Sequence, residues 1–147
     1  MKNLLVIISL LTSLSLSSQN TNDDCSNAIN ISSVDGYCSG DQEFSNLEAN
    51  PDPPFTNNCF INNVNGVWFS FVPNEPAVLI QIFSGGNFGT IEDPKMALFT
   101  GSCNGLDYID CSPGRGQFQD EFTVQDLTIG QRYYLFVESG ANTTGTF

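Results

Sequence analysis

The sequence contains no histidine, and it has very little positive charge. Without histidine, neither a Ser-His-Asp nor a Cys-His arrangement can be assembled to activate a nucleophile. Four Lys and Arg residues stand against sixteen Asp and Glu residues, which gives a formal net charge of -12. Because a charge of this sign repels phosphate backbones, we expect no nucleic-acid partner.

Other catalytic signatures are missing as well. Lys95 does not belong to a Ser-x-x-Lys motif, and the Gly-rich stretch FSGGNFGT (83–90) lacks the Lys-Ser/Thr pair of a phosphate-binding loop. Paired carboxylates could in principle hydrolyse a glycoside, but sixteen acids on one small chain make chance proximity common. We therefore assign no catalytic and no cofactor-binding residues, and we expect that the chain is not an enzyme.

Long hydrophobic runs are absent beyond the first residues. The chain begins with Lys2, an apolar stretch from Leu4 to Leu16 and small polar residues, which is the layout of a secretory signal peptide. The apolar stretch has 13 residues, fewer than the roughly 20 that span a bilayer. We therefore predict a signal peptide over residues 1–18, a mature domain over 19–147 without a membrane span, and a secreted or cell-surface location.

Helical periodicity is also absent, whereas strand patterns recur along the chain. Apolar residues do not keep the i, i+3, i+4 spacing of an amphipathic helix. Several short strands separated by Gly, Pro and Asn clusters instead predict an all-β sandwich of a single domain. The strongest runs occupy residues 66–72, 77–83, 95–100, 120–127 and 131–138, weaker ones 28–32 and 43–49, and residues 50–63 are expected to form a Pro/Asn-rich loop.

The five cysteines give an odd count in a chain that we expect to be secreted. Secretion favours disulfides over free thiols. The absence of histidine and of any C-x-x-C pair argues against zinc. An odd cysteine implies a free thiol, an intermolecular bridge or a missing partner. The cysteines are Cys25, Cys38, Cys59, Cys103 and Cys111.

Four stretches, in this order, resemble a known family. They are NDDCSNAI (22–29), GVWFSFVP (66–73), MALFTGSCNGLDYIDC (96–111) and LTIGQRYYLFVESGANTTGTF (127–147). Together they resemble the pre-peptidase C-terminal-like modules of secreted bacterial proteins, especially those exported by the type IX pathway. The resemblance implies an antiparallel, jelly-roll-like β-sandwich that accompanies enzymes or adhesins without catalysis of its own. The chain departs from the family at CSPGRG (111–116), where an Asn-Asp-Asp run is usual, which weakens a calcium role for this loop.

The resemblance also implies a disulfide pattern. It favours Cys103–Cys111 first and Cys38–Cys59 second, and it leaves Cys25 unpaired. A two-residue hairpin turn at Asn104-Gly105 would place Cys103 and Cys111 about 16 Å apart, beyond the limit of about 7 Å for a disulfide. Either this pair is wrong or residues 104–110 form a loop that doubles back, and we favour the loop.

The last residues, VESGANTTGTF (137–147), have the pattern of a final hairpin. Family members usually extend the last strand by a few residues, often with a cysteine. We therefore expect that Thr146-Phe147 begins a strand whose missing remainder carries the partner of Cys25, so that the chain is a fragment. Such a fragment would expose a sheet edge.

Two groups of side chains are candidates for ligand contacts. Asp23 and Asp24 are weak calcium candidates, because calcium prefers carboxylate oxygens, although exposed acids in turns are the favoured explanation. Trp68 lies inside a strong strand and is expected in the core. Phe55 and Phe60, in the Pro/Asn-rich loop, are better candidates for an exposed aromatic contact.

These observations favour a secreted, non-catalytic module that serves binding, adhesion or spacing in a larger cell-surface or extracellular protein. An extracellular protein or a polysaccharide is the expected partner, and calcium is the one cofactor that we retain as a candidate. The alternative is an N-terminal accessory domain of a secreted protease or glycosidase.

Overall fold

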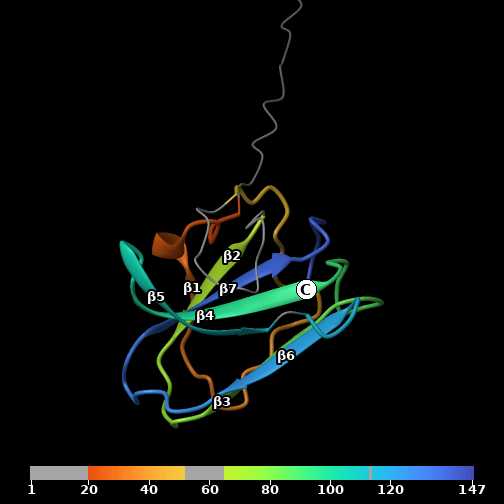
Figure 1. Cartoon of the computed structure of the whole chain (residues 1–147). Helices are drawn as coiled ribbons and strands as arrows, with labels where there is room; N and C mark the ends of the chain where they lie inside the picture. Colours follow the sequence, from red (N-terminus) through yellow and green to blue (C-terminus); the bar gives the residue numbers. More distant parts are fainter. Residues whose placement is uncertain (1–19, 52–64, 113) are drawn as a thin grey trace, which may run out of the picture.

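The computed structural model describes residues 20–51, 65–112 and 114–147, and over these ranges it is a two-layered β-structure (Figure 1). The predicted signal peptide (1–18) therefore lies outside the described residues. A five-stranded sheet has the order β1-β2-β7-β4-β5, and a two-stranded sheet consists of β3 and β6. The elements are η1 (Cys25–Asn27), β1 (Ile29–Ile31), β2 (Val67–Phe71), β3 (Val78–Phe83), β4 (Pro94–Ser102), β5 (Gly105–Ser112), β6 (Gln119–Val124) and β7 (Tyr133–Ser139).

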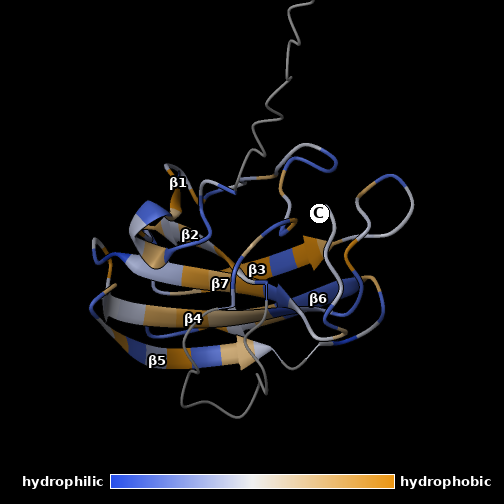
Figure 2. Cartoon of the chain, turned by 90° about the horizontal axis from the view of Figure 1, so that it is seen from above, coloured by the Kyte–Doolittle hydropathy of each residue, from blue (hydrophilic) through white to orange (hydrophobic). Residues whose placement is uncertain are grey.

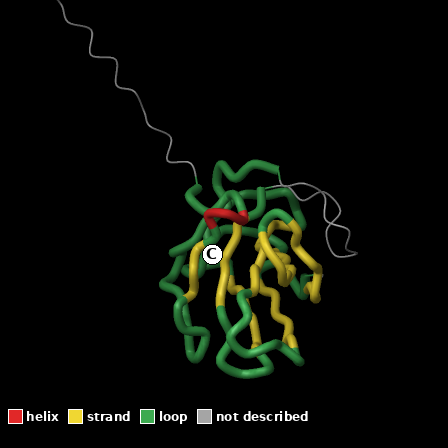
Figure 3. Tube along the Cα trace, turned by 90° about the vertical axis from the view of Figure 1, so that its left-hand side faces the viewer, coloured by secondary structure: helices red, strands yellow, loops and turns green. Residues whose placement is uncertain are grey.

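The predicted all-β class is confirmed, and the strongest runs of the sequence form strands β2, β3, β4, β6 and β7. Every pairing is antiparallel except that of β1 with β2, which is parallel. Parallel neighbours need a long crossover, and residues 32–66 supply the connection here. The tube in Figure 3 shows loops at both ends of the strands and the single helical turn, η1, at one of them. In the described ranges, no helix is long and apolar enough to cross a membrane.

The main core lies between the two sheets. Alternate residues of β2, Val67, Phe69 and Phe71, point towards the two-stranded sheet, where they belong to the same buried cluster as Ile82 and Phe122. Because successive side chains of a strand point to opposite faces, the intervening residues of β2 lie on the other face of the large sheet. All five residues of β2 are nevertheless buried, so both faces of this sheet are covered there.

A second cluster occupies the outer face of the large sheet. Trp68 is 1% exposed and lies 4.9 Å, between ring centroids, from Phe136, with Ala97 and Phe99 beside them. Gly66 lets the Phe136 ring approach the backbone, because a Cβ at that position would lie 1.8 Å from the ring. The expectation that Trp68 is a core residue is therefore confirmed.

Strand β5 was not predicted, and it overturns the loop expected over residues 104–110. Ser102 pairs with Gly105, so β4 and β5 form a hairpin with a tight turn at Cys103 and Asn104. Most β5 side chains are exposed, which is why the run lacks the apolar pattern of a central strand. An edge strand tolerates such residues because it is paired on one side only.

The hairpin geometry corrects the predicted disulfides. Cys103 is bonded to Cys25, with 5.5 Å between their Cα atoms, so the Cys103–Cys111 pair and the unpaired Cys25 were both wrong. Cys111 pairs with Ala97 well along the hairpin, out of reach of the turn, and is itself disulfide-bonded. Cys38 is free and exposed, so the Cys38–Cys59 pair was also wrong. Cys59 lies outside the described residues.

The last described residues, 145–147, lie antiparallel to residues 44–46. The N–H groups of Phe44 and Phe147 each donate to the other's carbonyl, at 3.0 and 2.9 Å, and Ser45 and Thr146 form a bridge. The residues predicted to begin a final strand, Thr146-Phe147, thus form a single bridge with Ser45 and not a hairpin with β7, and the expectation that a further stretch of this strand carries the partner of Cys25 was wrong, because Cys25 is bonded to Cys103. Asn46, fully buried, supports it by accepting from the Gly145 N–H at 2.7 Å and donating to the Asn65 carbonyl at 2.8 Å.

Candidate functional site

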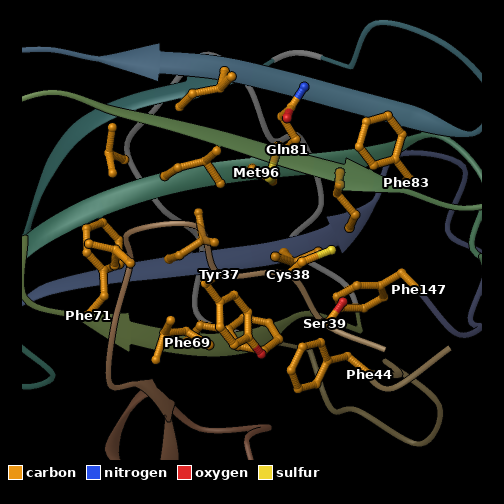
Figure 4. A pocket seen from close by; sticks show the side chains of 18 of the residues that line it. Tyr37, Cys38, Ser39, Phe44, Phe69, Phe71, Gln81, Phe83, Met96 and Phe147 are labelled. Atoms are coloured by element: carbon orange, nitrogen blue, oxygen red, sulfur yellow. The ribbon is translucent and has the colours of Figure 1, made fainter. Parts of the chain in front are cut away.

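An apolar groove of about 330 Å³ opens between β3 and the segment 34–44 (Figure 4). We call it the β3 groove. Its floor is the inner face of the large sheet, with side chains such as Phe69, Phe71 and Met96, and Phe147 lines it as well. The segment that faces β3 forms no strand of its own. The groove therefore reaches from solvent down to the core.

One wall of the groove is β3, which pairs with β6 on its other side only. In Figure 4, β6 lies on one side of β3 and the groove on the other. Figure 2 shows β3 as largely hydrophobic and β6 as largely hydrophilic. Along β3, Ile80 and Ile82 point inwards, whereas Leu79 and Phe83 are 56% and 49% exposed. This strand thus presents apolar side chains on both of its faces.

The opposite wall is held in place by hydrogen bonds to its own turn and to the 85–89 loop. The Glu43 carboxylate accepts from the Gly40 N–H at 2.6 Å, and the Gln42 N–H donates to the Phe88 carbonyl at 3.3 Å. Tyr37 and Cys38 line the groove from this wall. Burial raises the pKa of the Tyr37 phenol, and the nearby Glu43 carboxylate and Cys38 raise it further. The phenol is therefore a neutral hydrogen-bond donor at physiological pH.

Exposed aromatic side chains border the mouth of the groove. Phe88 is 55% exposed and its ring centroid lies 6.4 Å from that of Phe83, while Tyr37 is 47% exposed. All three line the groove, so the apolar surface is continuous rather than scattered. Contiguous exposed apolar surface of this kind is a candidate for an interaction site.

The charges around the groove are of one sign. Asp41 is the sole charged side chain among the described residues that line it. The basic side chains of the described residues form contacts outside the groove. The Lys95 ammonium nitrogen lies 3.8 Å from a carboxylate oxygen of Asp93, and a guanidinium nitrogen of Arg115 lies 3.2 Å from a carboxylate oxygen of Glu121. The third, Arg132, donates to the side chains of Asn30 and Ser70. Among the described residues, the groove thus has no cation with which to bind an anionic ligand.

The two weak calcium candidates are not brought together on a shared site. Asp23 is buried, and its carboxylate accepts from the backbone N–H and the side-chain amide of Asn50, at 2.6 and 2.5 Å. Asp24 is exposed at the start of η1. Within the described ranges, no group of three or more His, Cys, Asp and Glu side chains could hold a metal ion. Asp23 instead fastens the N-terminal segment to residue 50.

A buried carboxyl group, that of Asp120, lies on β6 opposite Ile82 of β3. Asp120 is 2% exposed, and its Oδ1 accepts from the Ser112 hydroxyl and, at 2.9 Å, from the Glu121 N–H. Its Oδ2 has no hydrogen-bond partner among the described residues. Burial raises the pKa of Asp120, and the two hydrogen bonds and Arg115 oppose this rise. This group belongs to the core rather than to the groove.

Comparison with known proteins adds no assignment. No family model, no curated protein and no solved structure matches this chain. The resemblance to the pre-peptidase C-terminal-like modules therefore stays a prediction.

The groove residues were not found from the sequence. Phe55 and Phe60, the expected exposed aromatics, lie outside the described residues. A signal for the groove was present in AVLIQIF (77–83), where both faces of one strand are apolar. We interpreted that run as a doubly covered central strand, but β3 is covered on one face only.

Proposed function

We propose that this domain is a secreted, non-catalytic β-sandwich module, related to the pre-peptidase C-terminal-like modules, that binds a segment of an extracellular protein in the β3 groove. The observation that carries the proposal is the apolar groove at the open side of β3, bordered by Tyr37, Phe83 and Phe88. A cell-surface or larger extracellular protein is the setting that the sequence predicts. Type IX export and a jelly-roll-like arrangement are part of the same proposal.

A protein segment fits this groove better than a polysaccharide does. A sugar-binding site needs several polar groups aimed at hydroxyls, and aromatic rings alone do not supply them. The described lining is mainly aliphatic and aromatic, with Asp41 as its one charged group. Apolar side chains of a polypeptide match this surface, and their burial contributes roughly 25 cal/mol per Å².

The proposal is tested by screening the purified chain against a phage-displayed peptide library and a polysaccharide array in parallel. Phe88→Ser removes an exposed groove residue and should weaken the binding of the enriched peptides about tenfold or more, because an aromatic anchor at an interface contributes more than 1 kcal/mol. Ile129→Ser is the matched control: Ile129 is 59% exposed and does not line the groove, so its replacement should leave binding unchanged.

Peptides that bind the Phe88→Ser chain as tightly as the original would contradict the groove as the site. Enrichment on the polysaccharide array alone would replace the protein ligand by a glycan. Turnover of a peptide or glycoside by the purified chain would instead support the accessory domain of a hydrolase, and would rule out a module without catalysis.

A further inference from the structure

We infer that the occupant of the β3 groove is an extended, positively charged polypeptide segment that adds to the free edge of β3 as a further strand. The inference rests on the proposed function and specifies its ligand. Strand addition uses the backbone hydrogen bonds of an exposed sheet edge for affinity and alternate side-chain pockets for specificity. The structure supplies both parts at the same place.

The backbone of β3 offers a set of unused hydrogen-bonding groups. The Ser84 N–H donates to the Phe118 carbonyl at 2.8 Å, and in an antiparallel ladder such bonded pairs alternate with non-bonded ones. In the observed register, Ile80 and Ile82 are therefore bonded to β6, and the N–H and C=O groups of Leu79, Gln81 and Phe83 point to the free edge. No backbone hydrogen bond joins these three residues to another described segment.

The edge also lacks the features by which proteins prevent strand addition. Exposed edges are normally protected by Lys, Pro, a bulge or a covering segment. The edge residues of β3 are Leu79, Gln81 and Phe83, none of which is charged, and the pairing with β6 runs without a register shift. By contrast, β5, one edge strand of the large sheet, carries Asp107 and Asp110 and includes a register shift in its pairing with β4. Of these two, β3 is the edge open to a partner.

The side-chain pockets are positioned for an extended chain. A strand beside β3 would lie about 4.8 Å from it, with every second side chain pointing towards the large sheet. Those side chains would enter the groove between β3 and segment 34–44, above Phe69 and Met96. Apolar residues at alternate positions of the occupant are therefore required, and the positions between them face solvent.

The negative charge of the protein indicates which kind of segment occupies the β3 groove. The protein carries a formal net charge of -12, and Asp41 lies in the groove itself. Lys or Arg residues in the occupant match this surface and raise its association rate. A second copy of this chain would bring the same negative charge, and like charges across an interface oppose association.

The test uses the purified, isotope-labelled chain and a synthetic peptide of about eight residues, a usual strand length. The peptide alternates valine with threonine and carries a lysine at each end. Amide hydrogen exchange is followed residue by residue by NMR. Strand addition predicts that the amides of Leu79, Gln81 and Phe83 gain at least tenfold protection, whereas those of Ile80 and Ile82, already bonded to β6, change little.

Two variants separate the backbone contribution from the side chain. Gln81→Pro removes the outward N–H at an edge position where proline is tolerated, and it should weaken peptide binding about fivefold to tenfold. Gln81→Ala keeps this N–H and removes only the side chain, so it should weaken peptide binding less than Gln81→Pro does. If Gln81→Pro does not fold, the exchange pattern of the original chain still decides the question.

Other results of these experiments would overturn strand addition, the positive charge of the occupant or its identity. Peptide binding that depends on Phe88 but leaves the three edge amides unprotected overturns strand addition and leaves the binding module intact. Equal binding of a peptide with glutamate in place of the lysines overturns the cationic occupant. Edge protection that rises with chain concentration in the absence of peptide shows that a second copy is the occupant. If the lysine-flanked peptide does not bind, strand addition is wrong. A library screen that enriches no peptide would overturn the proposed function as well.

Discussion

Cys25 and Cys103 are joined by a disulfide, with their Cα atoms 5.5 Å apart, although 78 positions separate them in the sequence. Cys25 begins η1, and Cys103 lies in the turn of the β4–β5 hairpin. The bond therefore ties the N-terminal segment to the edge of the large sheet. It lies beside the outer cluster of Trp68 and Phe136, against which Cys25 packs.

Removal of this bond should destabilise the fold. A cross-link that closes a loop of this length restricts the unfolded chain, and losing such a disulfide costs about 2–4 kcal/mol. We expect Cys25→Ser combined with Cys103→Ser to lower the free energy of unfolding, measured by urea denaturation, by about this amount. Cys38→Ser is the control, because Cys38 is free and exposed. Equal stability of the double variant and the control would show that the bond is not structural.

The buried Asp120 should make stability depend on pH. Burial raises its pKa in the folded state, so the folded protein keeps this proton at a pH where the unfolded chain, with a pKa of about 3.9, has lost it. The folded state then binds more protons, and this group's contribution to stability falls as pH rises from the unfolded pKa through the folded pKa.

Asp120→Asn isolates this contribution. It keeps an acceptor oxygen for the Ser112 hydroxyl and the Glu121 N–H, but it does not ionise. We expect the melting temperature of the variant, relative to the original chain, to rise between about pH 4 and pH 7. A constant difference across this range, or one that grows in favour of Asp120, would contradict a raised pKa.

Gly89 should be required for the docking of residues 145–147. A Cβ at position 89 would lie 2.1 Å from the Thr146 carbonyl oxygen, which accepts from the N–H groups of Thr90 and Ile91 at 2.8 and 3.1 Å. Because the added Cβ would collide with backbone atoms of Thr146, Gly89→Ala should lower the free energy of unfolding by about 1–3 kcal/mol. The same change should speed amide exchange at Phe147.

Gly105→Ala is the matched control for that change. A Cβ at position 105 meets no atom within 4 Å, so we expect a change within about 0.5 kcal/mol. Comparable losses in the two variants would show that the close approach of Gly89 to Thr146 does not matter for stability.

The sequence predicted the central strands of this fold better than its edge strands. Central strands such as β2 and β7 are apolar on both faces, and that pattern can be recognised without any knowledge of their neighbours. Strand β5 carries Asp107, Asp110 and few buried side chains, so nothing in its composition distinguishes it from a loop. The Cys25–Cys103 bond forms because η1 lies beside the hairpin turn. This contact joins residues 78 positions apart, so no local spacing in the sequence predicts it.

The groove escaped prediction for a related reason. The run 77–83 has the composition of a central strand, and whether it receives a second neighbour is decided by segments far away in the chain. Segment 34–44 lies opposite β3 without pairing with it. The exposure of Leu79 and Phe83 is therefore a property of the assembled sheets, and not of the strand itself.

The measurement that tests the binding groove most directly uses the free thiol of Cys38, which lines it. The purified chain is alkylated at Cys38 with a bulky maleimide, without prior reduction, and its affinity for the lysine-flanked valine–threonine peptide is compared with that of the untreated chain. Cys38→Ser, treated in the same way, is the control, and the melting temperature verifies that the fold is kept. We predict that alkylation weakens binding at least tenfold in the original chain and not at all in Cys38→Ser. Unchanged affinity after complete alkylation would contradict the β3 groove as the binding site.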